Sequence, residues 1–466
     1  MIRFGTSGWR AVLGEGFTFD KARRVVTSIV RVARESGDPA RGIVLASDTR
    51  FLGERFVEEA ARVIAREGVR PIVADRDVPT PAVSFAIRSL GALGGINFTA
   101  SDNPPEYNGI KFSTADGAPA LPRVTSMVEA AIAKTTAADA APAPKAAFDR
   151  LEASASYLRD LASKVDTRVL AASGLRVAVD PRFGTSRGYL DLFLRGAGID
   201  VTTINFHRDP YSVGLSARCD EANLGSLAAV VTREKRALGL ATDGDGNRFG
   251  VLDADGSYVD PNLCLMLLTD MLLARRSPGD TRGVARSVAT THGLDAVAKA
   301  HGAPLFSRPV GFRYIGELLL AGKIVVGGEE SAGFTMEGHV PVKDGLLAGL
   351  LLAELVARTG KSLRTLLDDL FERVGRFVPA RTGVRLDPSL AAKLKKRLDE
   401  DPSTFAGLKV EGIDRTDGQK LLLGSGRWIL LRPSGTEAVI RIHAESDSET
   451  ETARLVAAAK AHVFES

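Results

Sequence analysis

The segment that begins at Thr99 places a serine where it could carry out chemistry. Ser101 follows the apolar run 93–98 and precedes two prolines and an Asn-Gly pair, which force an irregular loop. A serine at the head of a rigid loop can act as a nucleophile or as a phosphate carrier. Spacing alone favours the alternative, a polar turn. A Ser-His-Asp hydrolase is disfavoured because no Gly-x-Ser-x-Gly motif surrounds Ser101.

A second segment alternates oxygen-bearing side chains with glycine. Asp243, Asp245 and Asn247 stand at every second position, so an extended loop would point their oxygens toward one spot. Mg²⁺ prefers oxygen ligands of this kind. Arg248 and Ala254 occupy the positions where a calcium loop needs Gly and Glu, which excludes that type of loop. The sequence therefore favours a divalent cation site over a simple polar turn.

Two further segments could recognise a phosphorylated sugar. Glu329 and Ser331 follow the predicted strand 323–326 and suit neighbouring sugar hydroxyls, although a surface turn is the stronger interpretation of this pair alone. Residues 432–437, Arg-Pro-Ser-Gly-Thr-Glu, follow the predicted strand 428–431 and are typical of a phosphate cradle. Together, the four segments indicate an enzyme that moves phosphoryl groups on a sugar phosphate.

Composition limits the class of protein. The chain has 466 residues, 44% hydrophobic and 25% charged, as expected for about three or four globular domains. The net charge is +4 and basic residues are mixed with acidic ones, so a nucleic-acid partner is not expected. Cys219 and Cys264 are isolated, which argues against disulfide and zinc frameworks. The longest apolar stretch, 345–357, contains Glu354 and predicts a buried helix, so we expect a cytoplasmic protein with no membrane partner.

The elements that must position these segments alternate along the chain. The pattern predicts three α/β units and a smaller C-terminal α+β unit. An Ala-rich stretch at 132–147 is either a linker or a weak helix end. The predicted helices include 22–34, 54–67, 151–165, 186–197, 262–274 and 448–464, and the predicted strands include 42–46, 70–74, 175–180 and 200–204.

The order of these motifs resembles the α-D-phosphohexomutase superfamily of phosphoglucomutases and phosphomannomutases. The resemblance spans the whole chain and is carried by residues 4–10, 99–103, 108–111, 243–248, 309–315, 328–331 and 432–436. It implies a four-domain, heart-shaped α/β enzyme with a central active site. The implied domains are 1–145 with the phosphoserine loop, 146–254 with the metal loop, 255–375 with the sugar loop, and 376–466 with the phosphate loop.

The resemblance also implies a role for each motif residue. Ser101 would carry the phosphoryl group, and Mg²⁺ would lie between it and Asp243, Asp245 and Asn247. A hexose 1,6-bisphosphate would be both intermediate and activator, and the enzyme would be a monomer or homodimer. The remaining residues fall into a catalytic group, Arg10, Lys111 and Arg248, and a substrate-binding group, Glu329, Ser331, Gly311, Arg313, Arg432, Ser434, Gly435 and Thr436.

Two positions depart from the family pattern. Asp102 replaces the usual His, and Asn247 replaces the usual third Asp of the metal loop. One change adds negative charge and the other removes it, so our hypothesis is that they compensate.

The substrate expected from the sequence is glucose. Ala332-Gly333 stands where bifunctional mannose/glucose enzymes carry Gly-His, and His339 and residues 343–345 also fit the glucose pattern. We therefore expect interconversion of glucose 1-phosphate and glucose 6-phosphate. The alternatives are a phosphomannomutase, a phosphoglucosamine mutase, a phosphopentomutase, a synthase that releases the bisphosphate, and a phosphosugar-binding protein without turnover.

Overall fold

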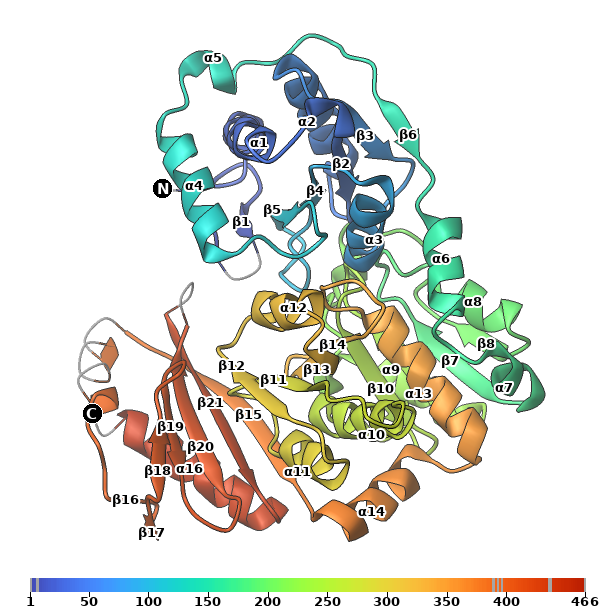
Figure 1. Ribbon diagram of the computed structural model, residues 1–466, viewed down its shortest axis with the longest axis vertical. Coiled ribbons are helices and arrows are strands. Elements are labelled where there is room, and N and C mark those ends of the chain that lie inside the picture. Colours follow the sequence, from blue (N-terminus) through green and yellow to red (C-terminus); the bar gives the residue numbers. More distant parts are fainter. Residues whose placement is uncertain are drawn as a thin grey trace.

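Four main sheets follow one another along the chain and organise the fold (Figure 1). The computed structural model describes residues 2–5, 8–387, 390, 391, 394, 397–434 and 438–464. In Figure 1 the first domain (blue to cyan) lies against the second (green) and third (yellow to orange), and the fourth (red) lies beside the third. This is the expected architecture of three similar α/β domains and a smaller C-terminal domain.

The first sheet has six strands in the order β1-β5-β4-β2-β3-β6. Strands β4, β2, β3 and β6 run parallel, whereas β5 pairs antiparallel with β4 and the edge strand β1 pairs antiparallel with β5. Helices α1 and α2 share one apolar cluster, and α3 contributes to another. The elements are β1 (Trp9–Val12), α1 (Phe19–Arg34), β2 (Ile43–Ser47), α2 (Gly53–Arg66), β3 (Pro71–Ala74), α3 (Thr80–Leu90), β4 (Gly94–Phe98), β5 (Tyr107–Thr114), α4 (Pro122–Ala133), α5 (Ala137–Ala140) and β6 (Asp149–Leu151).

The second and third sheets have four strands each, in the orders β10-β9-β7-β8 and β12-β11-β13-β14. The second domain contains α6 (Ser154–Ala162), α7 (Thr167–Ala172), β7 (Arg176–Asp180), α8 (Leu190–Gly196), β8 (Asp200–Thr203), α9 (Gly225–Arg233), β9 (Leu238–Thr242) and β10 (Phe249–Asp253). The third contains α10 (Pro261–Ala274), β11 (Gly283–Ser287), α11 (Gly293–Ala300), β12 (Leu305–Arg308), α12 (Phe312–Leu320), β13 (Ile324–Glu329), β14 (Gly333–Met336), α13 (Gly345–Thr359) and α14 (Leu363–Val374).

The same four-strand unit recurs in the first three domains. Its orders are β5-β4-β2-β3, β10-β9-β7-β8 and β14-β13-β11-β12. In each unit three strands are parallel, and the first-named strand is antiparallel to its neighbour. The three copies therefore share a topology that residue identities along the chain do not reveal.

The fourth domain is built differently. Its main sheet is antiparallel throughout, in the order β15-β21-β20-β19-β18, and the C-terminal helix α16 packs on it. The elements are β15 (Val378–Arg385), β16 (Thr404–Phe405), β17 (Leu408–Lys409), β18 (Gly412–Asp414), β19 (Gln419–Leu422), β20 (Trp428–Pro433), β21 (Val439–Ser446) and α16 (Glu449–Phe464).

Apolar packing joins the first three domains more extensively than the fourth. One continuous cluster includes residues of α3 in the first domain, of the second sheet and of the buried helix α13 in the third. The fourth domain has its own core and meets the third through a small cluster formed by Val288, Ala289, Trp428 and Leu430. Within the described part of the chain, no helix combines the length and apolar character needed to cross a membrane.

Two predicted helices begin later than expected. The helix predicted at 151–165 begins at Ser154, because residues 149–151 form β6 and pair with β3. The helix predicted at 186–197 begins at Leu190. Thr185 and Ser186 instead hydrogen-bond to Gly244 and Thr242, so this turn supports the end of β9. The stretch 132–147 contains the one-turn helix α5 between extended segments.

A buried lysine anchors the fourth domain to the third and should make this contact sensitive to pH. Lys420 Nζ donates to the carbonyl of Val288 at 2.7 Å, lies 2.8 Å from His292 Nε2, and sits 3.7 Å from the centre of the Trp428 ring. Burial, reinforced by the charge of Arg286, lowers the pKa of Lys420 to about 7 from 10.5. The folded chain therefore releases this proton in a pH range where the unfolded chain still holds it.

We expect the stability contributed at Lys420 to rise with pH between about 7 and 10.5. In that window the unfolded state binds more protons than the folded state, which gives up to about 1.4 kcal/mol per pH unit. Urea unfolding of the wild type and Lys420→Met at several pH values measures this directly. As pH rises, the free energy of unfolding of the wild type should increase relative to that of Lys420→Met. A difference that does not change with pH would contradict the lowered pKa of Lys420.

Candidate active site

The candidate loops occupy one topological position in the first three domains. Each joins the strand at the end of the parallel set to the antiparallel strand beside it: residues 99–106 between β4 and β5, 243–248 between β9 and β10, and 330–332 between β13 and β14. In the fourth domain, residues 434–438 join β20 to β21. We name these the serine loop, the metal loop, the sugar loop and the phosphate loop.

Ser101 is buried where the serine loop meets the metal loop. Its side-chain hydroxyl donates to Asp243 Oδ2 at 2.8 Å, although the two residues belong to different domains. Its backbone N–H donates to Thr99 Oγ1 at 2.9 Å. The φ angle of Ser101 is 51°, in the left-handed region that non-glycine residues adopt only when their surroundings hold them there.

The turn of the metal loop orients the carboxylate of Asp243. Oδ1 accepts the backbone N–H groups of Asn247 and Arg248 at 2.9 Å each, which leaves Oδ2 to face Ser101. Gly246 allows this tight turn because its φ is 69°. Burial and the neighbouring charge of Asp245 raise the pKa of Asp243 above its usual range.

Asp245 receives two side chains from the first domain. Lys111 Nζ on β5 donates to its Oδ2 at 2.5 Å, and the hydroxyl of Thr80 donates to the same oxygen. Burial alone would raise the pKa of Asp245, but Lys111 outweighs it and holds that pKa below the usual range. Its other oxygen, Oδ1, is buried and has no hydrogen-bond partner among the described residues.

Three arginines surround Asp102 on the polar side of the site, and the most distant, Arg218, has its Nε 3.7 Å from Asp102 Oδ2. Arg248 Nη1 donates to Asp102 Oδ2 at 2.6 Å, and Arg10 Nη1 lies 3.6 Å from Asp102 Oδ1. Arg10 also donates to Asn103 Oδ1 from β1, which pairs with β5. Burial disfavours the charged carboxylate, but Arg248, Arg10 and Arg218 together hold the pKa of Asp102 well below its usual range.

The residues present fit a hard divalent cation. Asp245 offers a buried carboxylate oxygen with no described partner, and Asp243 and Ser101 place two further oxygens beside it. Oxygen donors of this kind suit Mg²⁺. No cluster of three or more His, Cys, Asp and Glu side chains suited to a metal occurs in the part of the chain that the structure describes. A third ligand from Asn247 would be an amide carbonyl oxygen rather than a carboxylate.

Glu329 is the last residue of β13, so the expected loop assignment for 327–329 is wrong. Pairing of Gly327 to Glu329 with β14 extends the strand. Glu329 Oε1 accepts the N–H of Gly311 at 2.6 Å, and Oε2 lies 2.8 Å from Lys343 Nζ. Lys343 also donates to Ser331 Oγ at 2.7 Å, so one ammonium group joins both predicted sugar ligands.

Arg313 lies in the first turn of α12, after Gly311. Its Nη1 donates weakly to the carbonyl of Ala120 in the first domain at 3.4 Å, and its Nε has no hydrogen-bond partner within the described ranges. Burial lowers the pKa of Arg313, while the nearby carboxylate of Glu329 acts in the opposite direction. The arginine therefore belongs to the same polar group as Glu329.

Arg432 lies near the end of the fourth-domain strand β20 and is linked to the third domain through Asp417. Its Nε donates to Asp417 Oδ2 at 2.8 Å, and the same oxygen accepts the N–H of Val310 at 3.0 Å. Val310 precedes Gly311, so Asp417 links Arg432 to the segment that binds Glu329. The N–H of Ser434 donates to the carbonyl of Val439 at 2.8 Å, whereas Gly435 and Thr436 lie outside the described residues.

The metal and sugar loops also meet through the start of α13. The N–H of Gly345 donates to the carbonyl of Gly246 at 3.2 Å, and a side chain at Gly345 would collide with the carbonyl of Arg248. Lys343 stands two residues earlier and reaches Glu329. Residues 343–345 thus connect the cation site to the sugar loop.

Family comparisons agree with this order of domains. Four phosphoglucomutase/phosphomannomutase domain families match in sequence: the α/β/α domains I, II and III over residues 1–139, 155–256 and 260–374, and the C-terminal domain over 387–462. The chain belongs to the phosphoglucomutase/phosphomannomutase family. It is therefore a phosphohexomutase-type enzyme of the isomerase class.

Individual relatives carry different substrate names. A phosphoglucomutase/phosphomannomutase of Thermococcus kodakarensis is 28% identical over 96% of this chain and 95% of its own. A phosphoglucosamine mutase of Chromohalobacter salexigens is 31% identical over 95% of this chain and 94% of its own. A solved structure, named a candidate phosphomannomutase of Thermus thermophilus, superposes with a TM-score of 0.87 at 32% identity over 99% of both chains.

The structure brings the two departures from the family pattern together around Arg248. Asp102 binds the guanidinium of Arg248, and Asn247 directly precedes it. We expect Asp102→His and Asn247→Asp each to lower activity, and the double variant to recover part of the loss, with a coupling energy of about 1 kcal/mol or more. Steady-state rates and Mg²⁺ affinity measure the cycle. Strictly additive effects on both quantities would refute the compensation hypothesis.

Several residues of the site were missed by sequence reasoning. Thr80 and Asp417 come from segments without a recognisable motif, so the sequence contained no signal that they reach Asp245 and Arg432. Lys343 belongs to the Lys-Asp-Gly run at 343–345, which could be recognised in the sequence. Its contacts with Glu329 and Ser331 are seen only in the structure.

Proposed function

We propose that the enzyme interconverts glucose 1-phosphate and glucose 6-phosphate through a phosphorylated Ser101. The observation that carries the proposal is the buried hydrogen bond between Ser101 Oγ and Asp243 across two domains. A serine hydroxyl placed against two carboxylates and surrounded by cationic side chains suits phosphoryl transfer, in which catalysis is mainly positioning and charge neutralisation.

The proposed cycle conserves one phosphoryl group on the enzyme. Phosphorylated Ser101 transfers its phosphoryl group to the free hydroxyl of the bound hexose phosphate, and the hydroxyl proton leaves to a basic group. The hexose 1,6-bisphosphate turns over within the site and returns its other phosphoryl group to the Ser101 oxygen. Added bisphosphate would prime the unphosphorylated enzyme.

Each candidate residue has a role in this cycle. Ser101, Asp243, Asp245 and Asn247 would hold Mg²⁺, which when bound supplies charge neutralisation at the transferring phosphoryl group. Lys111, Arg10 and Arg248 would neutralise the rest of its charge. Glu329, Ser331, Gly311 and Arg313 would orient the sugar, and Arg432, Ser434, Gly435 and Thr436 would hold the phosphate that does not react.

The glucose preference rests on the residues that follow the sugar loop. Gly333 and Phe334 follow Ala332, so no histidine stands directly after the sugar loop to favour the bifunctional mannose/glucose pattern. His339 fits the glucose pattern in the sequence, but it is buried and lies 2.7 Å from Asp344, so it adds no evidence of direct sugar recognition. A phosphomannomutase and a phosphoglucosamine mutase remain the alternatives, because relatives with those names are about equally similar.

The decisive experiment compares kcat/KM for glucose 1-phosphate, mannose 1-phosphate and glucosamine 1-phosphate on one enzyme preparation. We expect glucose 1-phosphate to be preferred and only catalytic amounts of glucose 1,6-bisphosphate to be needed. A preference for another hexose would replace the substrate assignment. Stoichiometric bisphosphate formation would instead indicate a synthase, and binding without turnover would indicate a phosphosugar-binding protein.

Phosphorylation of the serine gives an independent check. Intact mass of the protein incubated with glucose 1,6-bisphosphate should show one added phosphoryl group, and peptide mapping should place it on Ser101. Ser84 is the internal reference, since it is another buried serine of the same domain and should remain unmodified.

A further inference from the structure

Arg50 lies outside every segment that carries the proposed chemistry, yet its guanidinium holds the serine loop together. Nη1 donates to the carbonyls of Pro104 and Tyr107 at 2.7 and 2.9 Å. Nη2 donates to the carbonyls of Ser101 and Asn103 at 2.9 and 2.5 Å. One side chain, 5% exposed, therefore satisfies four backbone oxygens in and just after this loop.

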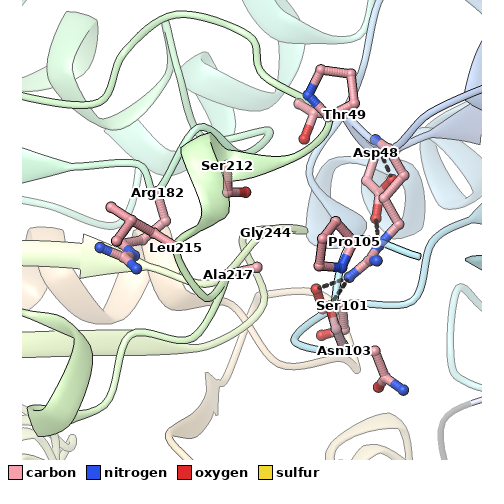
Figure 2. A pocket seen from close by; sticks show the side chains of 12 residues that line it. Asp48, Thr49, Ser101, Asn103, Pro105, Arg182, Ser212, Leu215, Ala217 and Gly244 are labelled. Carbon is pink, nitrogen blue, oxygen red and sulfur yellow. Dashed lines mark hydrogen bonds and ion pairs between the residues drawn. The ribbon is translucent and has the colours of Figure 1, made fainter. Parts of the chain in front are cut away.

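Asp48 completes the arrangement on the opposite side. Its Oδ1 accepts the backbone N–H of Arg50 at 2.9 Å, and its Oδ2 lies 3.2 Å from Arg50 Nε. Oδ2 also accepts the hydroxyl of Thr99 at 2.5 Å, and Thr99 Oγ1 accepts the N–H of Ser101. Both backbone polar groups of Ser101 are thus tied to the Asp48–Arg50 pair. Figure 2 shows Asp48, Ser101 and Asn103 close together on one side of a pocket.

These bonds hold Ser101 in a conformation that it would not adopt freely. Its φ of 51° is uncommon for a residue with a side chain, and such conformations persist only where the surroundings impose them. In this conformation Oγ points at Asp243. Phosphoryl transfer depends on alignment, so a loop that relaxes by even about 1 Å would lose rate.

We propose that Arg50, supported by Asp48, is a positioning residue that fixes the direction of the Ser101 hydroxyl without touching substrate. The inference rests on the proposed role of Ser101 as phosphoryl carrier. Arginine is required because its planar group offers five N–H donors in a fixed fork, whereas a lysine ammonium offers three donors from one point.

The second domain provides a matched control. Arg182 follows β7 as Arg50 follows β2, and its backbone N–H donates to Asp180 Oδ1 at 2.8 Å. It is 2% exposed, and its guanidinium donates to the carbonyls of Asn223 and Ser216. Arg182 lines the same pocket as Ser101, on the opposite side (Figure 2). Arg182→Lys therefore disturbs an equally buried Asp-x-Arg pair that holds residues 216 and 223 and not the serine loop.

The experiment compares Arg50→Lys, Asp48→Asn and Arg182→Lys with the wild type, using the hexose 1-phosphate that the wild type turns over fastest. We expect Arg50→Lys to lower kcat by about 10- to 100-fold while KM changes less than about threefold. Single-turnover transfer from the phosphorylated enzyme should slow by the same factor. Asp48→Asn should act in the same direction with a smaller effect.

Thermal unfolding separates positioning from stability. Arg182→Lys should lower Tm about as much as Arg50→Lys but keep kcat within about twofold. The proposal is overturned if Arg50→Lys keeps wild-type kcat, or if Arg182→Lys loses as much. If Arg50→Lys does not fold, unchanged kcat in Asp48→Asn overturns it. A wild type that turns over substrate without phosphorylating Ser101 would refute the proposed function instead.

Discussion

Ser101→Ala is expected to abolish phosphoenzyme formation and to lower turnover by at least about 10⁴-fold. The substitution removes the atom that would carry the phosphoryl group, so no neighbouring side chain can replace it at the same position. The lost hydrogen bond to Asp243 should cost about 1 kcal/mol of stability, which leaves the fold intact. Intact mass after incubation with bisphosphate and a coupled assay for hexose 6-phosphate measure the two effects.

Ser84→Ala is the matched control for this variant. Ser84 is 1% exposed, and its hydroxyl donates a hydrogen bond to the carbonyl of Gly117 at 2.7 Å. Its loss should destabilise the first domain by a similar amount without changing turnover. Near-normal activity in Ser101→Ala would show that another group carries the phosphoryl or that transfer is direct.

The four loops could be predicted from the sequence because each concentrates its chemistry in a few consecutive residues. Asp243 and Asp245 alternate with glycines in one short turn, so their proximity follows from chain connectivity. The partners that act on them come from elsewhere. Lys111 reaches Asp245 only because β5 faces the second domain, and no spacing within either segment encodes that contact.

Three similar α/β domains were expected, but the strand order that they share could not be read from residue identities, for a related reason. The central parallel strands are almost entirely buried in all three, but a buried apolar position requires only a hydrophobic residue of suitable size, not the same one. The three domains therefore keep the same strand order although their residues at matching positions differ. Asp48 and Arg50 were visible as the polar end of a strand, and only the structure shows that they hold the Ser101 backbone.

Asp245→Asn should also cause a large loss of activity. The loss should come from weaker cation binding and not from a change at Ser101. Asp245 Oδ1 is the buried oxygen for which the described residues provide no partner, and its Oδ2 binds Lys111. An amide would remove one negative charge and leave Lys111 without its counterion. We expect Mg²⁺ affinity to weaken by at least about 100-fold and kcat to fall by about 10³-fold.

Asp253→Asn distinguishes this effect from simple loss of a buried carboxylate. Asp253 is 3% exposed at the far end of β10, where it accepts the N–H groups of Leu363 and Arg364 at 3.1 and 2.8 Å and so caps α14. Its replacement should cost about 1 kcal/mol of stability and leave cation binding unchanged. Calorimetric titration with Mg²⁺ and Mn²⁺ measures binding without turnover. Equal affinity in Asp245→Asn and the wild type would remove Asp245 from the cation site, whereas weakened binding restricted to Asp245→Asn would assign its free oxygen to the metal.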